Sequence, residues 1–170
     1  MHSSSSLLAM AFPETVQNNC GLEVQQAATE NFWQLSSLKE ALIAAETGGV
    51  HAMHDPTEGG VATAIHELAQ AAGLGVVVWQ ERLLISEETK RLCHEFQLNP
   101  LGVISSGALL IAAEPTKSSE IMSAVAKYNI PCGIIGQLLP PENGRWIEEN
   151  GQRRPLPIFE SDEITKIFVN

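Results

Sequence analysis

The residues with the clearest chemical potential lie in one stretch, from His54 to Gly60 (HDPTEGG). Pro56 has no amide hydrogen and biases Asp55 away from helical backbone angles, so the chain must turn here before a helix can begin. Asp55 or Thr57 can cap that helix through a side-chain oxygen. Glu58 adds a negative charge near the positive end of the helix dipole. The pattern therefore predicts a turn followed by a capped helix over residues 57–72.

Two adjacent glycines, Gly59 and Gly60, are poor helix formers and need a reason such as close approach of a ligand or of another backbone segment. Unpaired amides at a helix start, with no side chain in the way, are typical of an anion site. A phosphate there would be repelled by Asp55 and Glu58 unless a cation such as Mg²⁺ lies nearby. The alternative is a well-capped helix whose glycines allow tight packing on a neighbouring strand.

Histidines flank the same stretch and raise the question of a metal site. His51 and His54 lie three residues apart on an extended segment, so their side chains point to opposite faces. At most one of them can join Asp55 and Glu58. A hydrolytic metal centre of His51, His54 and Glu58 is therefore a weak third hypothesis, and we expect no metal site.

Composition limits the class of protein. The chain has 170 residues, of which 44% are hydrophobic and 18% charged, which predicts one globular domain with appendages. A formal net charge of -10 argues against nucleic acid and against an anionic membrane as partners. Three cysteines without a CxxC pair fit a reducing compartment, and no apolar run approaches the length of a membrane span. We therefore expect a cytoplasmic protein.

The remaining sequence alternates between helical and strand patterns. It predicts helices over 37–47, 86–96, 115–129 and 162–168, and strands over 50–53, 75–79, 108–113 and 134–135. Residues 140–144 are typical of a hairpin turn into a strand over 145–149. Ser105 to Gly107 form either a second polar corner or a simple turn or bulge. These elements predict an α/β or α+β fold, with one mixed sheet of four to six strands packed with helices.

The sequence between Leu35 and Trp146 resembles the AIR synthase-related family, which includes the hydrogenase maturation protein HypE. The resemblance rests on four motifs in the family's order: residues 54–64 (HDPTEGGVATA), 99–101 (NPL), 106–110 (SGALL) and 134–136 (IIG). It implies the family's C-terminal, PurM-like domain over residues 35–155. Residues 1–34 would then be a tail or inter-domain linker, and residues 156–170 a tail with a short helix.

The resemblance also implies a function. Family members are two-domain, usually dimeric enzymes that use ATP to activate a substrate oxygen or sulfur by phosphorylation. It implies ATP and Mg²⁺ in the intact enzyme, with little bound tightly by this chain alone. It further implies a missing N-terminal ATP-binding domain as partner, a homo-oligomer and a small-molecule substrate. The residues it places at the site are Asp55 and Glu58 as catalytic groups, and His54, Thr57, Gly59, Gly60, Ser106 and Gly107 as phosphate- or substrate-binding groups.

Two departures from the family separate this chain from HypE itself. Position 58 is Glu where HypE typically has Arg, and the chain ends in Asn170 without the terminal cysteine of HypE. A second hypothesis is therefore a stand-alone, non-catalytic binding or assembly domain of the same fold. In that case Trp33, Trp79 or Trp146 would anchor a partner.

Overall fold

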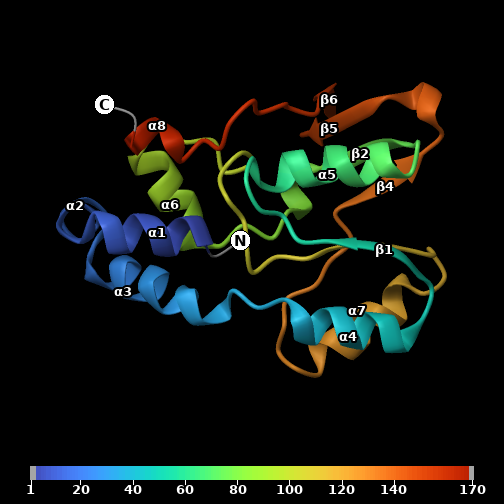
Figure 1. Cartoon of the computed structure of the whole chain (residues 1–170), viewed down its shortest axis with the longest axis horizontal. Helices are drawn as coiled ribbons and strands as arrows, with labels where there is room; N and C mark the ends of the chain where they lie inside the picture. The colour runs from blue at the N-terminus through green and yellow to red at the C-terminus, as the bar shows by residue number, and fades with distance from the viewer. Residues whose placement is uncertain (1–2, 169–170) are drawn as a thin grey trace.

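The computed structural model describes residues 3–168, and consecutive helices open the chain and are followed by a mixture of strands and helices in Figure 1. The α-helices and 3₁₀ helices are α1 (Ser3–Ala11), α2 (Pro13–Cys20), α3 (Leu22–Glu30), η1 (Asn31–Gln34), α4 (Leu38–Thr47), α5 (Gly60–Ala71), η2 (Gln80–Arg82), α6 (Glu87–Glu95), α7 (Ser118–Ala126), η3 (Pro141–Asn143) and α8 (Thr165–Phe168). The strands are β1 (Val50–His54), β2 (Gly75–Trp79), β3 (Leu110–Ala113), β4 (Gly136–Leu139), β5 (Arg145–Glu149) and β6 (Gln152–Pro155).

The strands form two sheets. In the four-stranded sheet the order is β4-β2-β5-β6, with β2 parallel to β5 and the other pairs antiparallel. The second sheet is the antiparallel pair β1 and β3. The predicted α/β class with a mixed sheet of at least four strands is confirmed. The strands are nevertheless divided between two sheets, where the sequence predicted one.

Strand β2 is the centre of the larger sheet, as its continuous apolar run predicts. Gly75 to Val78 are buried, and helix α5 packs Val61 and Ile65 against the same cluster that contains Ile147 of β5. The predicted hairpin at residues 140–144 is wrong, because β4 and β5 both pair with β2, which lies between them. The connection therefore crosses the end of β2 instead of making a tight turn between neighbours.

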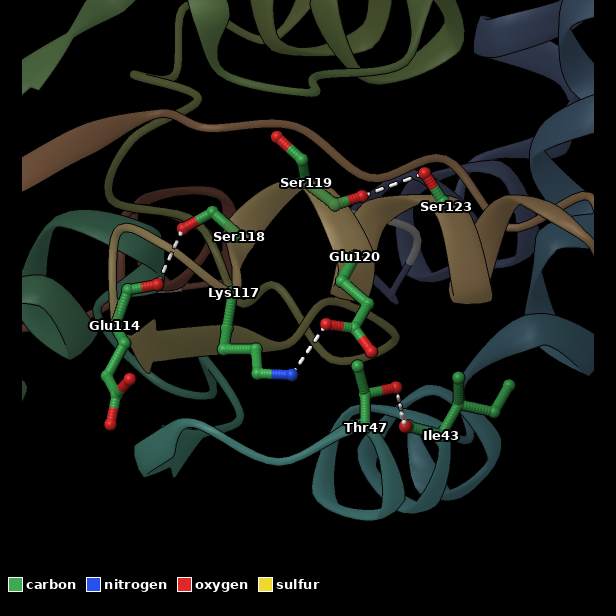
Figure 2. A network of polar contacts seen from close by, with 8 residues as sticks. All are labelled: Ile43, Thr47, Glu114, Lys117, Ser118, Ser119, Glu120 and Ser123. Carbon is green, nitrogen blue, oxygen red and sulfur yellow. Dashed lines mark hydrogen bonds and ion pairs between the residues drawn. The ribbon is translucent and has the colours of Figure 1, made fainter.

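Helices α4 and α7 lie side by side in Figure 1 and pack on the sheet of β1 and β3. Their shared core contains Ala44, Ile121 and Val125. The polar contacts drawn in Figure 2 are local in sequence. On α4, Thr47 Oγ1 donates to the Ile43 carbonyl at 2.8 Å. At and before α7, Ser123 Oγ donates to the Ser119 carbonyl at 2.8 Å, Ser118 Oγ donates to the Glu114 carbonyl at 3.2 Å, and Lys117 pairs with Glu120 at 2.6 Å. Solvent-exposed contacts of this kind contribute little to the stability of the fold. The packing of apolar side chains therefore holds α4 and α7 together.

Residues 3–34 are helical, where the sequence predicted a tail or an inter-domain linker. They form α1, α2, α3 and η1, which gather with α6 and α8 at one end of the molecule in Figure 1. Leu8 and Val16 are fully buried in a core cluster that also contains Leu92 of α6. The helical end is therefore built into the fold, while the division of the chain into domains stays a prediction.

The helices and the cysteines bear on the expectations from composition. Among the described residues, no helix combines the length and apolar character needed to cross a membrane. Cys20 and Cys93 are buried and Cys132 is exposed, all as free thiols. Burial raises the pKa of Cys93 to about 12, so this thiol stays protonated and serves as a small core residue.

Candidate functional site

The two corners predicted from the sequence lie at the same end of the small sheet. His54, the last residue of β1, pairs with Leu110, the first residue of β3, and the two strands are antiparallel. The chain after His54 and the chain before Leu110 therefore leave the sheet at one end. This pairing brings the HDPTEGG stretch and the Ser106–Gly107 corner to a common edge. In that corner the Ala108 amide donates to the Ser105 carbonyl at 3.2 Å, and Gly107 takes a positive φ of 87°.

The turn into α5 differs from the predicted cap. The helix begins at Gly60, three residues later than expected, and its N-cap residue is Gly59 in the left-handed conformation with φ 74°. No side chain caps the helix, so the predicted capping by Asp55 or Thr57 is wrong. Instead the Gly60 amide donates to the Thr57 carbonyl at 3.1 Å. The tight backbone turn replaces a side-chain cap.

Gly60 is required by the approach of another backbone segment. A Cβ atom at this position would lie 2.6 Å from the carbonyl oxygens of both Leu101 and Val103. The Ala62 amide donates to the same Leu101 carbonyl at 3.0 Å, so the start of α5 is hydrogen-bonded to the Asn99–Val103 loop. Gly60 also has a positive φ of 67°, which a residue with a side chain adopts at a cost. For this glycine, the alternative of tight packing on a neighbouring segment explains the sequence.

The Gly59 amide binds a carboxylate from the far end of the chain. It donates to Asp162 Oδ2 at 2.9 Å in a buried contact, and Asp162 Oδ1 accepts from the Ile164 amide at 3.0 Å. Asp162 is only 7% exposed. The amide that was expected to be free for a ligand therefore holds an anionic oxygen of the protein itself. Sequence reasoning missed Asp162, and the only local signal is its position before the short helix α8.

Glu163, the next residue, ties the same segment to the loop that packs on Gly60. Its carboxylate accepts from the Asn99 amide at 3.0 Å and pairs with Lys166 at 2.5 Å, while its own amide donates to the Gly102 carbonyl at 3.0 Å. Burial alone would raise the pKa of Glu163, but the hydrogen bonds from Lys166 and Asn99 hold it below its ordinary value. The two adjacent acids thus hold the C-terminal segment against both loops of the site.

The lowered pKa of Glu163 gives a pH-dependent prediction. Because the folded state prefers the ionised carboxylate, its contribution to stability is present above the ordinary value of 4.5 and is lost as pH falls through the lower folded-state pKa. We expect Glu163→Gln to be less stable than the wild type at neutral pH, with the difference shrinking under acid. Urea denaturation at several values between about pH 6 and pH 3 measures it, with the exposed acid variant Glu142→Gln as control. Parallel curves for wild type and Glu163→Gln would contradict the assignment.

Three of the other predicted residues are open to solvent, whereas His54, Ser106 and Gly107 are half-buried. Asp55, Thr57 and Glu58 are exposed, and their side chains have no hydrogen bond given by the structure. His54 Nε2 pairs with Glu67 Oε2 on α5 at 2.7 Å. This ring nitrogen is therefore engaged by α5 and not by Asp55 or Glu58. Among residues 3–168, no group of three or more His, Cys, Asp or Glu side chains is placed to hold a metal ion. Asp55 and Glu58 are the oxygen donors that the stretch offers to a cation.

An open cavity of about 610 Å³ lies beside the C-terminal segment. It shares Asn99, Leu101 and Glu163 with the contacts described above, and Arg154 and Lys166 add positive charge to its wall. Arg154 is engaged with Gln80 at 2.7 Å, and Lys166 is engaged with Glu163. The cavity is therefore adjacent to the candidate site, on the loop that packs against Gly60.

The sequence pattern of a protein family described as "AIR synthase related protein, C-terminal domain" matches residues 1–147. The chain belongs to this family. The family match includes the N-terminal helices, whereas the four motifs covered only the sequence from Leu35 to Trp146. Membership confirms the family predicted from the four motifs, and it explains why those motifs occur in a fixed order along one domain.

The relatives of this AIR synthase-related chain include hydrogenase maturation proteins. It is 27% identical over 122 residues to a putative hydrogenase expression/formation protein of Methanocaldococcus jannaschii, covering 69% of this chain and 36% of the relative. It is 26% identical over 121 residues to the carbamoyl dehydratase HypE of Escherichia coli, covering 70% and 36%. The chain thus spans about a third of the length of these curated relatives.

A solved structure shows the same fold. The hydrogenase maturation protein HypE in complex with ATP aligns with a TM-score of 0.63 at 23% identity, covering 69% of this chain and 38% of that one. At this identity the likeness establishes the fold alone. The AIR synthase-related domain therefore has the PurM-like fold expected from its sequence.

Proposed function

We propose that this chain is the C-terminal part of an ATP-dependent enzyme that activates a small-molecule substrate by phosphorylation. The start of α5 would bind a phosphate group or the activated group of the substrate. The observation that carries the proposal is the hydrogen bond from the Gly59 amide to a carboxylate oxygen at 2.9 Å. An amide that holds one anionic oxygen at the positive end of a 12-residue helix suits a phosphate oxygen equally well.

The exposed side chains supply the other groups that such a site needs. Asp55 and Glu58 offer the oxygen ligands that Mg²⁺ prefers, and the cation would neutralise their repulsion of a phosphate and polarise the transferred group. Thr57 and His54 flank the phosphate position as substrate-binding groups. Ser106 and Gly107, which leave the small sheet at the same end, form the second edge of the site. The exposure of Asp55 and Glu58 supports a role toward a ligand, since neither carboxylate is used to cap α5.

The rest of the enzyme would come from outside this chain. The aligned part of this chain covers only 36% of the first relative, and a similar solved structure contains ATP. We propose an N-terminal ATP-binding domain as the partner that completes the nucleotide site, in a homo-oligomer acting in the cytoplasm. ATP and Mg²⁺ would then be shared between the two domains, with only a part of the contacts made by α5.

The second candidate function is a stand-alone binding or assembly domain of the same fold. It is favoured by the aromatic pair Phe32 and Trp33, whose rings stack edge-on with centroids 5.3 Å apart while Trp33 is 84% exposed. Large exposed aromatic side chains are typical anchors of protein interfaces. This candidate predicts that the chain binds a partner through Trp33, with an affinity that nucleotide does not change.

Calorimetric titration with a non-hydrolysable ATP analogue, with and without Mg²⁺, distinguishes the two candidates. The proposed enzyme predicts binding that requires Mg²⁺ and is lost in Asp55→Ala. Glu23→Ala removes an exposed acid from α3 and serves as the matched control, because it changes net charge equally at a distant element. If millimolar analogue gives no binding heat with the wild type, this chain does not hold a share of the site by itself, and the assembly function is favoured.

A further inference from the structure

We infer that the C-terminal segment carries a built-in competitor for the phosphate site: the Asp162 carboxylate occupies the Gly59 amide and must leave it before an external anion can bind. This inference rests on the proposed function, because it concerns the same amide. Figure 1 shows the segment running from β6 to α8, between the four-stranded sheet and the helical end of the molecule. Asp162 therefore reaches the motif from 103 residues away in the sequence.

Three amides at the start of α5 have acceptors within the chain. The Gly59 amide donates to Asp162, the Gly60 amide to the Thr57 carbonyl and the Ala62 amide to the Leu101 carbonyl. Only the first of these acceptors is a side chain. Rotation of the Asp162 side chain breaks its hydrogen bonds with the Gly59 and Ile164 amides and unfolds no backbone turn. The other two amides donate to backbone carbonyls, which can move only with the chain. Asp162 is thus the one acceptor that an incoming anion can displace.

The segment is held at both ends, so displacement is local to Asp162. Leu156 and Phe159 pack in the cluster around α5 and β2, and Ile164 packs in the cluster of the N-terminal helices. Glu163 is fixed separately by the Asn99 amide and Lys166. The two neighbouring acids therefore have different tasks: Glu163 anchors the segment, and Asp162 occupies the anion position.

The identity of the occupant predicts how the site discriminates between ligands. A carboxylate brings one negative charge and satisfies the amide at a hydrogen-bonded distance, so a weakly charged ligand gains little by replacing it. A phosphate group brings more charge, and with Mg²⁺ it also relieves the repulsion from Asp55 and Glu58. The competitor thus selects for phosphate delivered together with a divalent cation over phosphate alone.

The test is titration of the chain with pyrophosphate and Mg²⁺, followed by calorimetry and by the amide signal of Gly59 in ¹⁵N spectra. Asp162→Ala removes the competitor, and we expect it to bind about tenfold more tightly than the wild type. Asp162→Asn keeps an acceptor oxygen without the charge, so its affinity should be intermediate and its fold retained. Glu160→Gln removes the same charge from an exposed position two residues away and should bind like the wild type. Thermal unfolding of each variant confirms that it is folded.

The outcomes separate this inference from the proposed function. Equal affinity in all variants, with the Gly59 signal moving in each, would overturn the competition and leave the phosphate site standing. Weaker binding in Asp162→Ala would also overturn it, because Asp162 would then help to build the site. If the Gly59 signal moves in no variant, the phosphate site itself is absent and the competition is refuted with it.

Discussion

Replacing Gly60 by alanine is expected to lower the free energy of unfolding by about 3 kcal/mol, the sum of left-handed backbone strain and overpacking. The added Cβ would lie 2.6 Å from two backbone carbonyl oxygens, those of Leu101 and Val103, and φ is already 67°. Neither carbonyl can move freely, since the Leu101 oxygen also accepts from the Ala62 amide. Chemical denaturation with fluorescence detection measures the change.

Gly73→Ala is the matched control for this substitution. Gly73 follows α5 with a nearly identical φ of 65°, but a Cβ there would meet nothing within 4 Å. Its cost should therefore be the backbone strain alone, about 1 kcal/mol. Equal losses in Gly60→Ala and Gly73→Ala would show that the Asn99–Val103 loop does not press on the start of α5.

Replacing Leu8 by alanine is expected to lower the free energy of unfolding by about 3 kcal/mol, within the range for a fully buried leucine. Leu8 lies on α1, has no exposed surface, and belongs to the cluster that joins the N-terminal helices to α6. The prediction tests whether the first 34 residues are part of the cooperative fold. A linker at this position would tolerate the change.

The neighbouring residue provides the comparison. Leu7 is 45% exposed on the same helix, so Leu7→Ala should change the free energy of unfolding by less than about 0.5 kcal/mol. The two variants share composition and helix propensity and differ only in the face they occupy. Similar stabilities for Leu7→Ala and Leu8→Ala would mean that α1 is not packed as the structure has it.

Local signals predicted much of the fold. The apolar run Gly75 to Trp79 became the buried central strand β2, and Ser86 caps α6 by accepting from the Thr89 amide, as its position indicates. Asn150 and Gly151 turn β5 into β6 with positive φ angles. Each of these features depends on residues close together in sequence, which is why propensity and patterning found them.

The N-terminal helices were missed because their buried faces are narrow and contain polar residues. Ser3 to Ser6 are buried, although serine patterns do not indicate a core. A signal was nevertheless present: Val16, Cys20, Val24 and Ala28 recur every four residues and are all buried. The stripe is divided between α2 and α3 at Gly21, so it does not form one continuous helical pattern.

The resemblance assigned the motif and the Ser106–Gly107 corner to one site, and the pairing of β1 with β3 brings both to the same end of that sheet. Their role in binding a ligand stays a prediction. The partners of Gly59 and Gly60 could not be read from local sequence, because Asp162 and Leu101 are distant in the chain. Contacts of this range depend on how distant segments pack against one another, which local sequence patterns do not encode.

The most direct test of the proposed site follows the backbone amide signals of Gly59, Gly60 and Val61 while the ¹⁵N-labelled wild-type chain is titrated with a non-hydrolysable ATP analogue and Mg²⁺. We expect these three signals, at the start of α5, to move together and saturate, with smaller changes at Ser106 and Gly107. Shifts confined to residues around the cavity at Asn99 and Arg154, with the α5 signals unchanged, would contradict a phosphate site at this helix.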